Sequence, residues 1–215
     1  YSICSLTPTL TAPSALVADT REFFAIINSL TRFIKTSSFS ISTRTVLLTT
    51  GFPFFSVCAA AFVSFFAAGA EAAINMYPVI AEKIAAASPS AQVRIGELNQ
   101  DATAANIIER GLGFIDKMIE LAGADGKKVA VVGNELYVGK ATGAVAEAEA
   151  DVVIEVAVPA ETTPEATAPE ASKILSKSDT IAIFASNETT ANGLLTANDQ
   201  LNVLNADPAK GNVAA

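Results

Sequence analysis

The sequence predicts an α/β protein with a mostly parallel sheet covered by helices on both faces. From residue 67 onward, short apolar runs alternate with stretches of helical periodicity, the order typical of such folds. The runs at residues 129–132 and 181–184 are almost continuously apolar, as strands buried on both faces are. Polar residues such as Ser186 and Asn187 follow a strand directly, where open α/β sheets place ligand groups.

The apolar spacing assigns each element in turn. After residue 67 it predicts helices over residues 67–87, 104–122, 142–148, 165–175 and 189–195, and strands over residues 93–98, 129–132, 152–158 and 181–184. The second of these helices has Asp101 or Thr103 as its expected N-cap. Upstream, residues 20–34 show helical spacing, and residues 46–48 and 52–57 resemble strands.

Residues 51–70 contain no charged side chain and allow three interpretations. The stretch is long enough to span a bilayer, and the cations before it also fit a secretory signal peptide. We favour a buried strand followed by the start of a helix, because Gly51 and Pro53 break the apolar run near its beginning.

Composition excludes several classes of function. The chain of 215 residues has no His, so Ser-His-Asp hydrolysis, Cys-His nucleophiles and imidazole zinc sites are ruled out. Its net charge of -8 argues against a nucleic-acid partner. Ten of the twelve Phe precede residue 67, so the first part differs in kind from the rest. We therefore expect two units, residues 1–66 and residues 67–215, with no cofactor and no metal.

Two segments resemble functional motifs, a phosphate-binding loop and a catalytic carboxylate pair, but neither motif is complete. In VVGNELYVGKAT at residues 131–142, five residues separate Gly133 from Gly139, and Ala141 follows Lys140. A phosphate-binding loop needs four residues there and a Ser or Thr after the Lys, so a plain strand-loop-helix connection is favoured. The acidic residues of the 161–170 segment lie in a Thr/Pro-rich stretch, which indicates a solvated helix start rather than a catalytic carboxylate pair.

Two segments point to a family. IAIFASNETTANG at residues 181–193 is a strand, a polar break and a helix start, and residues 94–114 end in Arg-Gly-Leu-Gly-Phe. Together they resemble the type I periplasmic sugar-binding proteins of ABC importers, which share a fold with LacI-type repressor ligand domains. The resemblance implies two Rossmann-like lobes with parallel sheets, of which residues 1–66 would be a partial N-terminal lobe and residues 67–215 the C-terminal lobe.

The family's ligand residues map onto this chain by motif. The resemblance implies that Arg110 and Asn187 donate hydrogen bonds to sugar hydroxyls, with Asn99 and Gln100 in the polar loop before the helix. Glu161 stands near Pro159, where many members stack an aromatic ring on the sugar. The alternatives are that Arg110 pairs with a neighbouring acid, Glu109 or Asp116, and that Asn187 is an ordinary helix N-cap.

This chain departs from the family pattern in places. Cys58 and Ala59 stand where the family has an Asp, often with Arg, and the Gly-Phe-Asp strand end would follow Ala215. At most half of the family's binding site is therefore expected here, with weaker affinity.

The function implied is that of a solute-binding protein, not an enzyme. It would capture a small carbohydrate between two lobes and deliver it to an ABC-type permease, as a monomer in the periplasm or outside the cell, either free or as a membrane-anchored lipoprotein. The alternatives are a ligand-sensing domain of a sugar-responsive regulator or receptor, and a membrane-anchored or structural protein.

Overall fold

The computed structural model describes residues 53–215, with side chains from Phe65 onward. The predictions for residues 20–34 and 46–48 lie outside the described residues. The described residues form a five-stranded sheet in the order β2-β3-β1-β4-β5, and every strand pair in it is parallel. The strands are β1 (Val93–Leu98), β2 (Val129–Gly133), β3 (Val152–Ala157), β4 (Thr180–Ala185) and β5 (Val213–Ala214). The predicted α/β class with a parallel sheet is confirmed.

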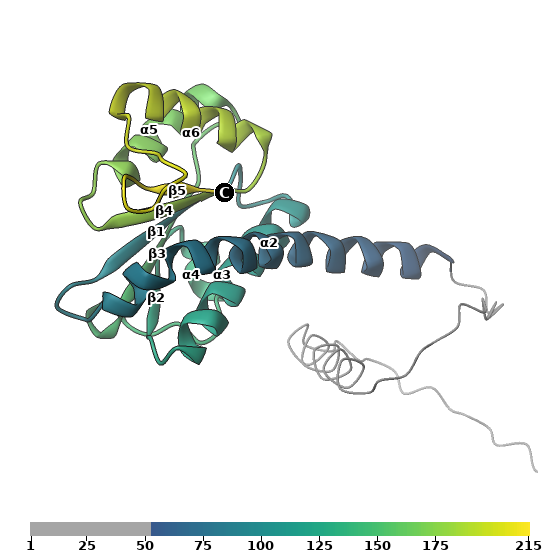
Figure 1. Ribbon diagram of the computed structural model, residues 1–215. Helices are drawn as coiled ribbons and strands as arrows, with labels where there is room; N and C mark the ends of the chain where they lie inside the picture. Colours follow the sequence, from purple (N-terminus) through teal and green to yellow (C-terminus); the bar gives the residue numbers. More distant parts are fainter. Residues whose placement is uncertain (1–52) are drawn as a thin grey trace, which may run out of the picture. The chain divides into compact units, whose positions relative to one another are not determined.

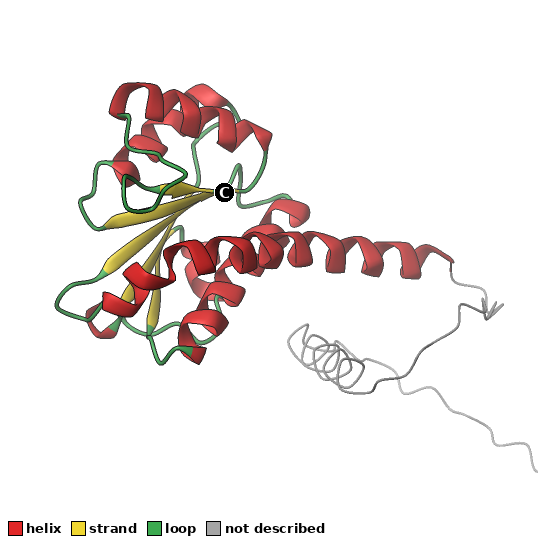
Figure 2. Cartoon of the chain, viewed as in Figure 1, coloured by secondary structure: helices red, strands yellow, loops and turns green. Residues whose placement is uncertain are grey.

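Helices cover both faces of the sheet (Figure 1, Figure 2). On one face, α2 (Pro53–Ala86) packs over β4 and β5, and α3 (Ala105–Ala124) and the short α4 (Glu135–Lys140) pack over β2; the apolar cluster beneath these helices includes side chains from all five strands. On the other face, α5 (Pro164–Leu175) and α6 (Glu188–Leu201) enclose a smaller apolar cluster. Because successive strand residues point to opposite faces, Ile95 joins the first cluster and Leu98 the second.

Two glycines let α2 and α3 approach closely. A Cβ on Gly69 would lie 1.8 Å from the Arg110 carbonyl oxygen, and a Cβ on Gly113 would lie 2.0 Å from that of Phe66. Larger side chains would hold the two backbones apart, so these glycines set the helix crossing. One residue after Gly113, the ring of Phe114 stacks on that of Phe184 in β4, with centroids 4.3 Å apart.

The strand predictions after residue 90 agree with the structure within a residue or two, but one helix was misplaced. The short helix predicted at residues 142–148 is wrong: α4 begins directly after β2, and only a 3-10 turn, η1 (Glu147–Glu149), follows later. Asn134 starts α4 by accepting a hydrogen bond from the Leu136 N–H at 3.1 Å. Gly143 adopts a positive φ of 86°, which a continuing helix does not allow.

The buried strand predicted after Gly51 is also wrong. Pro53 is the first residue of α2, which runs without interruption to Ala86. Proline suits the first helical position, where its missing N–H has no partner to lose, and the Ala-rich sequence that follows has high helix propensity. Cys58 and Ala59 therefore lie within a helix and not after a strand. Within the described part of the chain, none of the helices combines the length and apolar character that crossing a bilayer requires.

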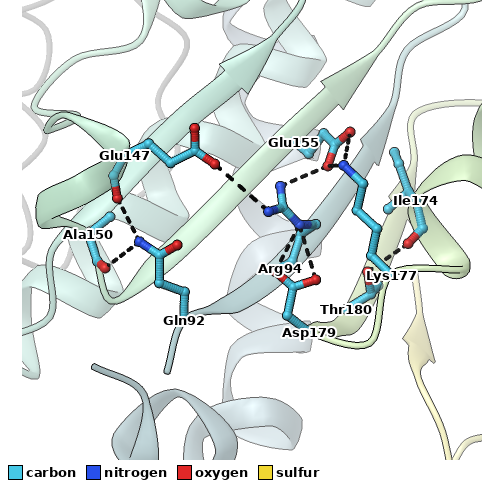
Figure 3. A network of polar contacts seen from close by, with 9 residues as sticks. All are labelled: Gln92, Arg94, Glu147, Ala150, Glu155, Ile174, Lys177, Asp179 and Thr180. Atoms are coloured by element: carbon cyan, nitrogen blue, oxygen red, sulfur yellow. Dashed lines mark hydrogen bonds and ion pairs between the residues drawn. The ribbon is translucent and has the colours of Figure 1, made fainter. Parts of the chain in front are cut away.

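An ion-pair network joins the amino end of β1 to β3 and to the segment just before β4 (Figure 3). Arg94, the second residue of β1, donates to Glu155 of β3 at 2.8 Å and to Asp179, just before β4, at 3.1 Å. Lys177 adds a contact of 2.6 Å to the same Glu155 carboxylate. The Arg94 side chain is only 11% exposed, so this cation depends on its carboxylate partners for solvation. We call this group the amino-edge network.

Candidate functional site

Most of the predicted ligand residues meet at the carboxyl ends of β1 and β4. Arg110, in the second turn of α3, donates from Nη1 to the Ser186 carbonyl oxygen at 2.5 Å. The next residue, Asn187, donates from its side-chain amide to Oε1 of Gln100, which follows β1. Asn99 lies directly between β1 and Gln100. Parallel strands bring these ends to one edge, and we call this group of residues, with Glu97 and Ser186, the carboxyl-edge cluster.

Arg110 does not adopt the alternative arrangement expected from sequence. Its guanidinium donates to the Ser186 carbonyl and lies over the ring of Phe65, whose centroid is 5.6 Å from the guanidinium carbon. Asp116 instead accepts a hydrogen bond from the Thr142 N–H at 3.1 Å, and its burial raises its pKa. The Nε of Arg110 is buried without a hydrogen-bond partner. The planar fork thus retains donor capacity beside Ser186.

Asn187 is the N-cap of α6. Its Oδ1 accepts from the Thr190 N–H at 3.0 Å, and the Thr190 hydroxyl accepts from the Asn187 N–H at 3.1 Å. This reciprocal pair is a capping box, which satisfies backbone donors that a helix start leaves free. The N-cap role expected as an alternative is therefore present, while the amide nitrogen of Asn187 faces Gln100. One side chain serves both the helix and the cluster.

The deepest members of the cluster are Glu97 and Asn99, both with 0% exposure. The Asn99 amide nitrogen donates to Glu97 Oε1 at 2.5 Å. Burial raises the pKa of Glu97 well above its ordinary value of 4.5, the hydrogen bond from Asn99 opposes this shift, and the charge of Asp116 adds to it. Sequence reasoning selected Asn99 but missed Glu97. The available signal was an acidic residue inside an apolar strand, at the position whose side chain points towards α3.

Both glycines of the Arg-Gly-Leu-Gly-Phe motif have a packing explanation. A Cβ on Gly111 would lie 2.6 Å from both Glu97 Oε1 and Asn99 Nδ2, and 2.7 Å from a ring carbon of Tyr137. Tyr137 is fully buried in α4 and donates to the Asp101 carbonyl oxygen at 3.1 Å. Gly111 therefore makes room for the buried polar groups, as Gly113 makes room for α2.

Two further predictions concern the edges of this site. Glu161 is exposed in the loop between β3 and α5, so it is the one predicted ligand residue that is not buried or half-buried. Asp101 and Thr103 are not the N-cap of α3, which is Ala104. Asp101 instead accepts from the N–H groups of Thr103 and Ala104, at 2.7 and 2.6 Å, and the bond from Ala104 is the main reason that its pKa is lowered.

Four buried side-chain atoms without a hydrogen-bond partner are found in the described residues, and all four belong to this cluster. They are Glu97 Oε2, Asn99 Oδ1, Arg110 Nε and Ser186 Oγ. Buried polar atoms are nearly always paired in folded proteins, so their concentration here marks the carboxyl edge as the functional candidate. In the described part of the chain, no group of three or more Cys, Asp and Glu residues is placed to hold a metal ion.

Comparison with known proteins gives structural likenesses only. No protein-family model matches the chain, and no curated protein matches it. A solved structure described as an ABC transporter, LacI family transcriptional regulator from Brachyspira murdochii is 26% identical with a TM-score of 0.46, over 61% of this chain and 34% of its own.

Two other solved structures are described as an arabinose binding protein and as a solute binding protein with bound D-allose. AraP, an arabinose binding protein from Geobacillus stearothermophilus, is 16% identical with a TM-score of 0.39, over 64% of this chain and 35% of its own. An ABC transporter periplasmic solute binding protein from Actinobacillus succinogenes with bound D-allose is 16% identical with a TM-score of 0.41, over 68% and 42%. The chain spans between about a third and two fifths of their length.

Proposed function

We propose that this chain supplies one lobe of a carbohydrate-binding site, located at the carboxyl-edge cluster. The observation that carries the proposal is the convergence of Arg110, Asn187 and Gln100 at one edge of the sheet. A guanidinium fork and two side-chain amides offer several donors and acceptors within a small area, which suits a polyhydroxylated ligand. Fold alone does not assign a function, so the proposal depends on these side chains.

The remaining parts of the proposal extend it to the whole protein. The ligand would be enclosed when a second lobe closes over the cluster, with contacts made only in the closed state. The closed protein would deliver its sugar to an ABC-type permease, in the periplasm or outside the cell, without covalent chemistry. Glu161, exposed in the loop after β3, would contact the ligand from the rim.

Calorimetry with arabinose, ribose and D-allose tests the site. Arg110→Ala should weaken sugar binding by about 1.5–3 kcal/mol, because hydrogen bonds from a charged donor are lost. Lys117→Ala is the matched control: it also removes a cation from α3, but one paired with Glu120, and it should leave affinity unchanged. If the parent chain binds a sugar and Arg110→Ala binds it equally well, the site assignment is wrong.

Asn187 needs a different pair of variants because it also caps α6. Asn187→Ser retains an N-cap oxygen but removes the amide nitrogen that faces Gln100. It should lower sugar affinity by about 1 kcal/mol, the value of one neutral hydrogen bond, with little loss of stability. Asn187→Ala should lose both affinity and the cap. Unchanged affinity in Asn187→Ser would restrict this residue to its helix.

A further inference from the structure

Glu97 and Asn99 present two unpartnered acceptors in one buried place. Their single printed bond joins Asn99 Nδ2 to Glu97 Oε1, which leaves Glu97 Oε2 and Asn99 Oδ1 without partners. An ionised carboxylate has acceptors only, and an amide oxygen is also an acceptor. With both residues 0% exposed, the ionised form would leave two acceptors unsatisfied, at considerable cost.

A proton on Glu97 Oε2 removes this conflict. The carboxylic acid then has a donor as well as an acceptor. Its O–H could then donate to Asn99 Oδ1 while the Asn99 amide donates to Oε1, which would form a two-bond pair between acid and amide. One proton would give both unpartnered atoms a partner.

The charged and titratable groups around Glu97 favour the neutral acid. On α3, Asp116 raises the pKa of Glu97 by its charge, after the larger effect of burial. On α4, the buried Tyr137 phenol donates to the Asp101 carbonyl oxygen, so it brings no positive charge to Glu97. Gly111 of α3 covers Glu97, and the cation next to it in the sequence is Arg110. Its Nη1 donates to the Ser186 carbonyl and not to Glu97.

The packing holds this pair in place. The Cα of Gly111 covers it so closely that an added Cβ would meet both side chains at 2.6 Å. The pair therefore lies under the surface, where a sugar does not reach it in this conformation. From Asn99 the chain continues to Gln100, whose side chain accepts from Asn187, and the Asn99 N–H is fixed to the Ala157 carbonyl at 3.0 Å.

We propose that Glu97 is a neutral acid in the folded chain and a positioning residue of the carboxyl-edge cluster. Its two-bond pair with Asn99 fixes the loop of residues 99–103 and so sets where Gln100 meets Asn187. The pair itself stands on the geometry of these residues alone. Its effect on sugar affinity rests on the proposed function.

Carbon-13 NMR of the full chain, without any ligand, tests the pair directly. The side-chain carboxyl signal of Glu97 should keep the shift of a protonated acid at pH 7, while Asp101, whose pKa is lowered, shows an ionised signal in the same spectrum. A Glu97 signal that titrates at or below pH 4.5 would overturn the neutral acid. This measurement uses the parent chain, so it does not depend on whether a variant folds.

Two variants test the positioning role. Glu97→Gln keeps a donor and an acceptor in place, so it can form the same two-bond pair, whereas Glu97→Met cannot. The amide signals of Asn99, Gln100 and Asn187 should stay within their parent positions in Glu97→Gln and move in Glu97→Met. If Glu97→Met does not fold, a shift of these signals in Glu97→Gln would itself contradict the proposal. Unmoved signals in a folded Glu97→Met would also contradict it.

Sugar binding then separates this inference from the proposed function. Glu97→Gln should bind as the parent does at pH 7, and Glu97→Met should bind at least tenfold more weakly. Glu109→Gln is the matched control: Glu109 is a half-buried acid on α3, the helix that covers Glu97, and this variant should bind normally. If the parent binds none of the sugars, the proposed function fails, and the NMR result still decides the pair.

Discussion

The two ends of β1 handle charge in opposite ways. At the amino end, Arg94 is 11% exposed and lies among ionised partners, of which Glu155 is 19% exposed and Asp179 31%. Three residues later, Glu97 is 0% exposed and meets an amide instead of a cation. The amino-edge network keeps its charges because opposite charges and some water are available. Glu97 of the carboxyl-edge cluster has neither contact with water nor a cation as its partner, so this acid is best accommodated without charge.

Strand geometry explains the separation. Side chains of a strand alternate between faces, so Arg94 and Glu97 point to opposite sides of the same sheet. Arg94 shares its face with Glu155 of the neighbouring strand, and the loop before β4 adds Asp179. Glu97 points to the face covered by α3, directly beneath Gly111. Whether an ionisable residue in a strand keeps its charge therefore depends on the groups that cover its face of the sheet, and not on its residue type alone.

Removing the cation of the amino-edge network should have the largest effect. Arg94→Met leaves three carboxylates, those of Glu147, Glu155 and Asp179, without their shared partner. It should lower the free energy of unfolding by about 3 kcal/mol, the lower end for breaking a buried ion pair. Urea unfolding measures it. Lys177→Met is the control: Lys177 is 41% exposed and binds the same Glu155, so its loss should cost less than about 1 kcal/mol. Equal losses would mean that burial does not distinguish the two cations.

The pH dependence of stability should show the neutral acid. The folded pKa of Glu97 is raised above the unfolded value of 4.5. Above pH 4.5 the unfolded chain therefore loses a proton that the folded chain retains, and stability falls as pH rises, by up to about 1.4 kcal/mol per unit, until the folded pKa is reached.

Glu97→Gln removes this single contribution while other acids, such as Asp116, still titrate. Its stability relative to the parent should therefore increase steadily from pH 4.5 towards pH 7 in thermal or urea unfolding. A difference that does not change with pH over this range would mean that Glu97 titrates alike in both states, and the contrast between the two edges would lose its electrostatic basis.

Most of the fold after residue 90 could be predicted from the sequence. Apolar runs bounded by turn residues located four strands, and the polar residues directly after β1 and β4 located one edge of the site. Arg110 could be placed at the same edge because it lies in the second turn of a helix that begins shortly after a predicted strand. These inferences succeed because burial on both sheet faces leaves a clear apolar pattern.

Other features depend on contacts that are distant in the chain. That Glu97 is buried follows from the missing Cβ of Gly111 on another element, which no local pattern contains. The strand predicted at residues 52–57 failed because Phe and Val favour strands, whereas Pro53 and the following alanines also suit a helix start. The two-residue β5 is too short for any periodicity, and its pairing with β4 defines it.

Packing against the buried pair can be tested separately from its charge. Gly111→Ala places a methyl group 2.6 Å from the Glu97 and Asn99 side chains and should cost about 2 kcal/mol of stability through overpacking. Gly123→Ala is the matched control on the same helix, since nothing lies within 4 Å of its added Cβ. That variant should be neutral or slightly stabilising, because Ala favours a helix over Gly. If both variants lose the same stability, the helix backbone and not the buried pair sets the cost.

Salt should produce the smallest effect and the clearest contrast between the two edges. Double-mutant cycles measure the coupling of Arg94 with Glu155 and of Glu97 with Asn99. Raising the salt from 10 mM to 1 M shortens the Debye length from about 30 Å to about 3 Å. The half-buried ion pair should therefore lose a few tenths of a kcal/mol of coupling, and the acid–amide pair should lose none, because neither partner carries a charge. Salt dependence in the Glu97–Asn99 cycle would mean that Glu97 is ionised, and the two ends of β1 would then differ in exposure alone.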